Sequence, residues 1–242
     1  LTCTAGALSG TPTNDEVGSH SVVITASDVA GATATDTFTI TVANTNDAPT
    51  ITSTAVTSAT EDAAYSYTTT ASDVDSGDVV TLACTTVPSW LTCTAGALSG
   101  TPADANVGSH SVVITASDVA GAAATDSFTI TVANTNDAPA ISSTAVTAAS
   151  EDAAYSYAIT TSDDDSDSSD SWTITSTSVS WLTLTHTAGA STATLAGTPA
   201  NGDVGSHSVT VTVADAAGAT DTETFSIAVT NTNDAPTISS TA

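Results

Sequence analysis

The 242-residue chain contains no lysine and no arginine, although it carries 26 aspartate and glutamate side chains, and its formal charge is −26 with the four histidines neutral. A protein without fixed cations has no side chain to neutralise phosphates or to bind an anionic membrane surface. We therefore exclude nucleic acid as a partner. Because charged residues make up only 11% of the chain and hydrophobic residues 40%, the composition is that of folded domains and not of a disordered acidic tail.

Long apolar runs are also missing. No run approaches the roughly 18 residues that a membrane-spanning helix needs, so we expect no membrane insertion in this segment. Methionine is absent and aromatic residues are only 4% of the chain. Each domain must therefore build its core mainly from aliphatic side chains.

The sequence has no constellation of catalytic side chains. His20, His110 and His207 are equivalent copies within GSHSV motifs, and His186 stands alone. A catalytic group copied into every unit at a surface turn is not expected, and no serine lies in the setting of a nucleophile elbow. We predict that the chain is not an enzyme.

A repeat organises the chain. The motif NTNDAP begins at residues 44, 134 and 231, and EDAAYSY begins at 61 and 151, which gives a period of about ninety residues. The predicted units are the carboxy-terminal half of a repeat at 1–49, complete repeats at 50–139 and 140–236, and the start of a further repeat at 237–242; the third carries an insertion at 163–170.

Apolar residues within the repeats alternate with period two, as in half-buried strands, and helical periodicity is absent. Tyr65 and Tyr67 share one face of a predicted strand, as do Val112 and Ile114 of another. Turn sequences separate about seven such strands in each ninety residues. The predicted fold class is all-β, with an antiparallel β-sandwich in each of the tandem repeats of about 90 residues. Trp90 and Trp181 are predicted to anchor the cores.

The chain has three cysteines, an odd number. When the repeats are aligned on Trp90 and Trp181, Thr175 and Leu184 stand where Cys84 and Cys93 stood, so both cysteines are lost together. This predicts a disulfide between Cys84 and Cys93 and an oxidising compartment, and leaves Cys3 without a partner. Two buried free thiols are the alternative, and a metal site is disfavoured because no CxxC motif or nearby histidine completes it.

The acidic residues gather where one unit meets the next, in the NTNDAP linkers and in turns such as DVDSGD (73–78). Calcium binds six to eight oxygens from such mixtures of carboxylates, amide oxygens and backbone carbonyls. Because no lysine or arginine is present, these carboxylates must be hydrated, protonated or bound to metal. Their recurrence at every junction favours calcium over simple solvation.

Several of these motifs carry a family resemblance. VANTNDAP resembles the V-x-D-x-N-D-N-x-P linker of cadherins with one residue fewer, and ASDVDSGD resembles their A-x-D-x-D turn. PSWLTCTAGALSGTP (88–102) resembles bacterial cadherin-like and immunoglobulin-like repeats of the dystroglycan type. The resemblance covers all of 50–139 and most of the other units. It implies that the fold is a tandem of antiparallel Greek-key β-sandwiches of the cadherin or immunoglobulin type. It also implies calcium-stiffened modules strung along large cell-surface adhesins and secreted proteins.

The resemblance also implies calcium ligands at three junctions. The first would use Asp15, Glu16, Asn44, Asn46 and Asp47 with Asp73, Asp75 and Asp118; the second Glu61, Asp104, Asn134, Asn136 and Asp137 with Asp163, Asp165 and Asp215; the third Glu151, Asp203, Asn231, Asn233 and Asp234. We expect the third to be weak, because its other half would lie beyond Ala242. Asn44 replaces a cadherin aspartate, so we expect fewer ions than at a cadherin junction and dissociation constants of about 10⁻⁴–10⁻³ M. The DDDSDSSD insertion (163–170) either adds a site or is a solvated loop.

Two functions fit these features. The first is a calcium-stiffened structural segment of a large extracellular or cell-surface bacterial protein, such as an adhesin stalk or a biofilm matrix component, whose partners are neighbouring repeats of the same chain. The second is a module that assembles with copies of itself into an extracellular filament, or binds surface glycans or proteins. The second function remains an alternative because threonine-rich strands such as SFTITVAN (127–134) carry few of the charged side chains that prevent an edge strand from pairing with another chain.

Overall fold

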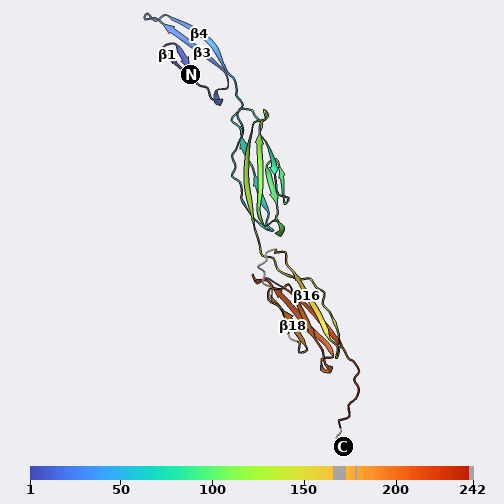
Figure 1. Cartoon of the computed structure of the whole chain (residues 1–242). Coiled ribbons are helices and arrows are strands. Elements are labelled where there is room, and N and C mark those ends of the chain that lie inside the picture. The colour runs from blue at the N-terminus through green and yellow to red at the C-terminus, as the bar shows by residue number, and fades with distance from the viewer. Residues whose placement is uncertain (166–172, 178, 240–242) are drawn as a thin grey trace. The chain divides into compact units, whose positions relative to one another are not determined.

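The structure is a computed structural model that describes residues 1–165, 173–177 and 179–239 (Figure 1). It divides into two compact units, Leu1–Ala133 and Asn134–Ala242, and each is described here by itself. In the described residues the regular structure consists of strands and three single-turn 3₁₀ helices. None of the helices in this part of the chain has the length and apolarity to cross a membrane.

The first part of the first unit consists of two hairpins and a 3₁₀ helix. Strands β1 and β2 pair antiparallel, and so do the longer β3 and β4. The elements are β1 (Thr2–Thr4), β2 (Ala7–Ser9), η1 (Asn14–Glu16), β3 (Gly18–Ser27) and β4 (Thr33–Val42).

Residues 50–133 form a complete β-sandwich. One sheet has the strand order β10-β11-β7 and the other β6-β13-β12-β9, while β5 pairs with β8. The elements are β5 (Thr50–Ile51), β6 (Ser58–Thr60), β7 (Tyr65–Thr68), β8 (Ala71–Ser72), β9 (Thr81–Thr86), β10 (Leu91–Thr94), β11 (Ala97–Gly100), η2 (Asp104–Asn106), β12 (Gly108–Ser117) and β13 (Ala123–Ala133).

The second unit repeats this arrangement, with sheets β14-β16-β19-β18 and β15-β21-β20-β17. The elements are β14 (Ala140–Ile141), β15 (Ala148–Ser150), β16 (Tyr155–Ser162), β17 (Thr173–Ser176), β18 (Leu182–His186), β19 (Thr192–Gly197), η3 (Asn201–Asp203), β20 (Gly205–Ala214) and β21 (Thr220–Thr230). The predicted all-β tandem sandwich is confirmed. One detail differs from the antiparallel prediction: the short edge strands β6 and β15 run parallel to β13 and β21.

Two tyrosines organise each core. The ring of Tyr67 lies edge-on to Phe128 with 5.6 Å between centroids, and the Tyr65 hydroxyl donates to the Val56 carbonyl oxygen at 2.7 Å. Burial, with a smaller effect of Tyr67, raises the pKa of Tyr65 to about 12, so its hydroxyl stays a neutral donor. Tyr157 and Tyr155 occupy the same positions in the second unit.

The sequence around Trp90 (88–102) is constrained by close packing. The Trp90 ring lies edge-on to Tyr65 at 5.7 Å and to His110 at 5.9 Å. Because the Asn106 carbonyl can only accept, His110 Nε2 donates to it, at 2.6 Å. A Cβ on Gly100 would overlap the Trp90 carbonyl oxygen. Only glycine therefore fits at the first position of the Gly-Thr-Pro sequence at 100–102.

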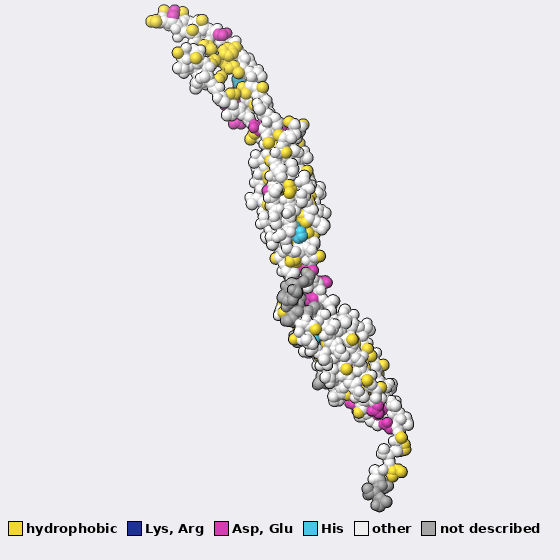
Figure 2. Space-filling view, viewed as in Figure 1, with side chains coloured by type: hydrophobic (Ala, Val, Ile, Leu, Met, Phe, Trp, Pro, Cys, Tyr) yellow, Lys and Arg dark blue, Asp and Glu magenta, His cyan; other side chains and the backbone are white. Residues whose placement is uncertain are grey.

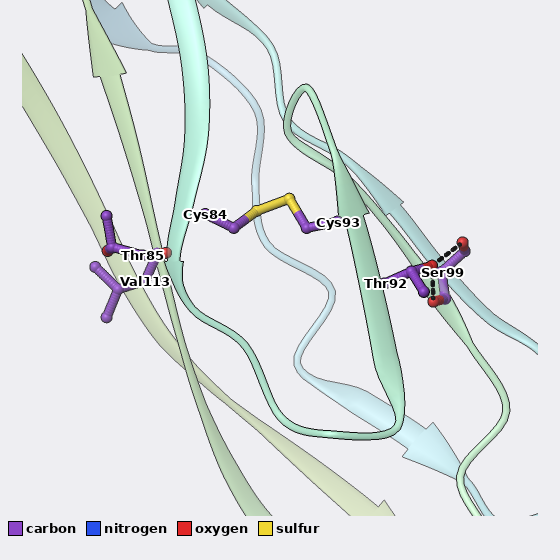
Figure 3. Close-up of a disulfide and its surroundings, with 6 residues drawn as sticks. All are labelled: Cys84, Thr85, Thr92, Cys93, Ser99 and Val113. Carbon is purple, nitrogen blue, oxygen red and sulfur yellow. Dashed lines mark hydrogen bonds between the residues drawn. A yellow bond between two sulfur atoms is a disulfide. The ribbon is translucent and has the colours of Figure 1, made fainter.

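A disulfide joins Cys84 of β9 to Cys93 of β10 and so links the two sheets (Figure 3). The Cα atoms are 6.4 Å apart, within the range that a disulfide spans. In the second unit, Ser176 and not Thr175 takes the place of Cys84, because Ser176 pairs with Val211 as Cys84 pairs with Ile114. Aligning the repeats on Trp90 and Trp181 paired Cys84 with Thr175, which is wrong by one residue. The reason is that β9 has a bulge opposite Val113 and Ile114, whereas the register of β17 is not shifted.

The disulfide gives the first testable prediction. The double substitution Cys84→Ser/Cys93→Ser should lower the free energy of unfolding of repeat 50–133 by about 2–3 kcal/mol, because the bond closes a short loop in the unfolded chain. Urea unfolding followed by tyrosine and tryptophan fluorescence measures this. Cys3→Ser is the matched control and should leave stability unchanged, because Cys3 is exposed and unpaired. Equal stability of the double variant and the control would contradict the prediction.

Candidate cation sites at the ends of the repeats

The DVDSGD turn between β8 and β9 places two carboxylates against the preceding linker. Asp75 is only 5% exposed, and its Oδ2 accepts a hydrogen bond from the Asp47 backbone N–H at 2.7 Å. Asp73 Oδ1 accepts from the Asp75 backbone N–H at 3.0 Å. The other oxygen of each carboxylate, Asp73 Oδ2 and Asp75 Oδ1, is buried and has no hydrogen-bond partner among the described residues.

The DVAG turn between β12 and β13 holds a third carboxylate, and this one is fully bonded. Asp118 Oδ1 accepts from the backbone N–H groups of Gly121 and Ala122 at 2.6 and 2.8 Å, and Oδ2 accepts from Asn46 Nδ2 at 2.7 Å. The Asn46 hydrogen bond, followed by those of the turn, holds the pKa of Asp118 below its usual range against the opposing effect of burial. Asp118 therefore stays ionised.

Asp73, Asp78 and Asp118 come together, each offering an oxygen within 4.8 Å of the others. Asp78 belongs to the DVDSGD turn but was not among the residues predicted as ligands. Since no lysine or arginine exists in the chain, the mutual repulsion of these charges is not relieved by an ion pair.

The other residues predicted for the first junction take different roles. Glu16 accepts from the backbone N–H and hydroxyl of Thr13, which lowers its pKa, and so completes the turn of η1. Asp15 lines a shallow pocket with Asn14 and Val74. Asn14, which was not predicted as a site residue, donates from Nδ2 to Asp47 Oδ2 at 2.9 Å. Asn44 is exposed.

The second unit repeats the linker contacts. Asn136 Nδ2 donates to Asp215 Oδ2 at 2.8 Å, and the Asp137 N–H donates to Asp165 Oδ2 at 2.8 Å. Asn134 Nδ2 also donates to Asp165 Oδ1, at 2.8 Å, so both oxygens of Asp165 are bonded. Asp163 keeps a buried Oδ2 without a hydrogen-bond partner in the described part of the chain, and burial raises its pKa.

Two residues predicted for the second junction, Glu61 and Asp104, lie in the first unit. Glu61 is 2% exposed, and its backbone N–H donates to the Ala133 carbonyl at 2.9 Å. Asp104 begins η2. Of the predicted insertion, residues 166–170 lie outside the described residues.

Another cluster is formed by Glu151, Asp152 and Asp234, whose oxygens lie within 4.8 Å of one another. Glu151 is 2% exposed; its Oε2 accepts from the Thr232 backbone N–H at 3.1 Å, and its Oε1 is buried without a hydrogen-bond partner in the described residues. Asn201 Nδ2 donates to Asp234 Oδ2 at 3.0 Å. Asp152 and Asn201 were not predicted.

The remaining residues predicted for this junction bond locally. Asp203 Oδ2 accepts from the Ala200 backbone N–H at 2.9 Å, as the turn of η3 requires. Asn231 and Asn233 donate to the backbone carbonyls of the residues that follow them, Thr232 and Asp234.

These clusters offer oxygen ligands and no histidine or cysteine. Hard cations such as calcium prefer this set, whereas zinc sites use nitrogen and sulfur. Four buried carboxylate oxygens have no hydrogen-bond partner in the described residues and are the atoms that fit a cation: Asp73 Oδ2, Asp75 Oδ1, Asp163 Oδ2 and Glu151 Oε1. Asp118 and Asp215 fit less directly, because amide and backbone N–H groups already bond to them.

Comparison with known proteins gives one family and one fold. A family model described as "Putative Ig domain" matches residues 1–43, 48–133 and 138–230. No curated protein matches the chain.

Cadherin ectodomains share the fold. A protocadherin structure, PcdhgB3 EC1-4, has a TM-score of 0.62 at 19% identity, over 93% of this chain and 60% of that one. Protocadherin Gamma B2 extracellular cadherin domains 1-5 has a TM-score of 0.56 at 21% identity, over 91% of this chain and 47% of that one. An endo-fucoidan hydrolase of glycoside hydrolase family 107 is 28% identical over 93% of this chain and 35% of its own length, with a TM-score of only 0.37. The chain thus spans less than two thirds of each of these structures.

The Asp118 turn predicts a pH dependence. A depressed pKa in the folded state contributes stability that is present above the ordinary aspartate pKa of about 3.9 and is lost as the pH falls through the folded value. Asp118→Asn should therefore lower the melting temperature at pH 7 and have little effect near pH 2. Thermal unfolding between these pH values, in chelator, measures it. Asp36→Asn, the same charge change at an exposed site of β4, is the control, and coincident profiles for the two variants would contradict the prediction.

Proposed function

The chain belongs to the "Putative Ig domain" family, and from this membership we propose that it is a structural segment of a larger extracellular or cell-surface protein, in which calcium restrains successive β-sandwich repeats. The repeats are the building units, and the acidic clusters at their ends are the calcium sites. The observation that carries the proposal is the pair of buried carboxylate oxygens, Asp73 Oδ2 and Asp75 Oδ1, that no hydrogen bond from the described residues satisfies.

An unsatisfied buried carboxylate oxygen is costly, because a charged group loses its hydration and gains nothing in return. In most proteins a lysine or arginine relieves that cost, but this chain has neither. A divalent cation supplies two positive charges and accepts several oxygens at once, so it is the compensation that this donor set favours.

The linker contacts support a mechanism by which a bound cation would restrain the chain. Asp47 and Asn46 of the linker already hydrogen-bond to Asp75 and Asp118 of the repeat that follows. A cation held by Asp73, Asp78 and Asp118 would lie beside these contacts and keep the turns in place. In its presence the Asn46 amide and the cation would compete for Asp118 Oδ2.

Further features support an extracellular location. The Cys84–Cys93 disulfide persists in oxidising compartments. Weak oxygen sites also suit surroundings in which calcium is abundant, since extracellular modules bind it with dissociation constants of about 10⁻⁴–10⁻³ M.

Calcium titration tests the proposal. The double variant Asp73→Asn/Asp78→Asn should bind calcium at this site at least about tenfold more weakly, because two of the three clustered carboxylates are lost. Isothermal titration calorimetry on the full chain measures the loss of one class of sites. The control is Asp36→Asn/Asp126→Asn, which removes the same charge from β4 and β13.

Small-angle X-ray scattering tests the restraint itself. Chelation of calcium should broaden the distribution of intramolecular distances, and readdition should reverse the change. Scattering unaffected by the chelator, together with equal binding by the two double variants, would refute the proposal. Assembly that grows with protein concentration in calcium would favour the filament alternative.

A further inference from the structure

The turn of η3 contains an asparagine followed by a glycine, Asn201–Gly202, and no other asparagine of the chain precedes a glycine. Both residues are exposed, and a Cβ built on Gly202 would meet no atom within 4 Å. Glycine leaves its backbone nitrogen unhindered and lets the chain rotate freely. The Gly202 nitrogen is therefore able to reach the side-chain carbonyl carbon of Asn201 and close a cyclic imide, a succinimide.

The Asn201 side chain lies at the cluster of Glu151, Asp152 and Asp234. Its Nδ2 donates to Asp234 Oδ2 at 3.0 Å, and the three carboxylates each offer an oxygen within 4.8 Å of the others. Glu151 is 2% exposed, and its Oε1 is buried without a hydrogen-bond partner in the described residues. Figure 2 shows acidic side chains gathered at the end of the second unit that is nearer the C-terminus. A chemical change at Asn201 therefore alters the ligand set of this candidate cation site.

Repeat 50–133 already has a carboxylate at the aligned position. Asp104 begins η2 as Asn201 begins η3. The residues before the two turns have the same backbone conformation, with φ −101° and ψ 176° at Ala103 and φ −98° and ψ 176° at Ala200. Asp104 and Glu61 offer oxygens within 4.8 Å of each other. An aspartate at position 201 therefore fits the existing turn.

We propose that Asn201–Gly202 is a site of spontaneous deamidation, and that the aspartate formed there raises the cluster of Glu151, Asp152 and Asp234 from three carboxylates to four and strengthens its affinity for calcium. The gain in affinity rests on the proposed function. The deamidation itself does not, because it follows from the Asn-Gly pair and its exposure.

The reaction needs only water. The Gly202 nitrogen gives up its proton to water and bonds to Asn201 Cγ, the bond from Cγ to Nδ2 breaks, and ammonia leaves with a proton from the solvent. Water then adds to one of the two carbonyl carbons of the succinimide. Opening at Cγ restores the peptide bond and gives aspartate, whereas opening at the main-chain carbonyl gives isoaspartate.

Ring closure requires the single turn of η3 to open. That turn is closed by one backbone hydrogen bond, from the Asp203 N–H to the Ala200 carbonyl at 2.8 Å. Exposed single turns open locally at a small cost in free energy. The folded repeat therefore permits the reaction without unfolding of its core.

Ageing of the full chain at neutral pH tests the deamidation. Mass spectrometry of peptic fragments measures the exchange of amide for acid and separates aspartate from isoaspartate. We expect conversion at Asn201 well ahead of Asn14, which makes the equivalent hydrogen bond to Asp47 at 2.9 Å but is followed by Asp15.

Gly202→Ala is the matched control, because its methyl group enters open space and Gly202 does not have a positive φ. It should slow the conversion at least about tenfold, which corresponds to a barrier higher by about 1.4 kcal/mol. Equal conversion at Asn201 and Asn14, or equal conversion in the natural chain and the Gly202→Ala chain, would overturn the proposal.

A second measurement tests the gain in affinity. In isothermal titration calorimetry, Asn201→Asp should bind calcium about tenfold more tightly at one class of sites, because a fourth carboxylate is present. In chelator the same variant should melt at a lower temperature, since two like charges replace the hydrogen bond to Asp234. Asn201→Ser, which removes the amide without adding charge, is the control.

The outcomes separate the two proposals. Equal calcium affinity of Asn201→Asp and Asn201→Ser would overturn the gain in affinity. Absence of calcium binding by every chain would refute the proposed function and the gain in affinity together, whereas the mass spectra decide on the deamidation by themselves.

Discussion

The need to compensate buried negative charge without any fixed positive charge governs the ends of these repeats. Every carboxylate that leaves water must accept hydrogen bonds from backbone or amide N–H groups or remain unsatisfied. Asp118 and Asp215 follow the first course, each with two backbone donors and an asparagine amide. Asp75 and Glu151 follow it only in part. The carboxylate oxygens that lack a compensating partner therefore lie beside the linkers. An ion bound there would affect the connections between repeats and not the hydrophobic cores.

The cores follow a different logic, because they are built from very few large side chains. Two tyrosines, one tryptophan and one phenylalanine are arranged edge-on in each complete repeat, and short aliphatic residues fill the remaining space. The close approach of Gly100 to the Trp90 carbonyl shows how tightly this small set is packed. Edge-to-face pairs of this kind contribute about 0.5–1.5 kcal/mol each beyond the area that they bury, which matters in a domain with so little aromatic surface.

The fold was predictable because its signals are local and repeated. Strict alternation along β12 and β13 specifies which face is buried, and the ninety-residue period specifies how many sandwiches there are. The positions of the carboxylates in the turns could be predicted for the same reason, because these turns are also local and repeated. The parallel pairing of β6 with β13 was not, since a three-residue edge strand has too little pattern to show its direction.

Side-chain partners across a linker were harder to predict. Glu16 and Asp203 were chosen for their charge, yet they bond to the starts of their own 3₁₀ helices, whereas the neutral Asn14 and Asn201 reach the linker aspartates. Asn14 aligns with Asp104 and Asn201, and Glu16 aligns with Asn106 and Asp203. A strict alignment of the three segments would have separated the two roles. Charge alone does not, because an amide and a carboxylate can each satisfy such a position.

The disulfide of repeat 50–133 has a mechanical consequence. Cys84 and Cys93 are nine positions apart in the sequence, and their Cα atoms are held at 6.4 Å. If a stretching force unfolded this sandwich, the disulfide would keep the segment between Cys84 and Cys93 looped. The extended length of the unfolded repeat would then be roughly 25 Å shorter than its residue count implies. Ser176 and Leu184 form no such bond in the second unit, so two repeats with the same topology would yield different lengths under the same pull.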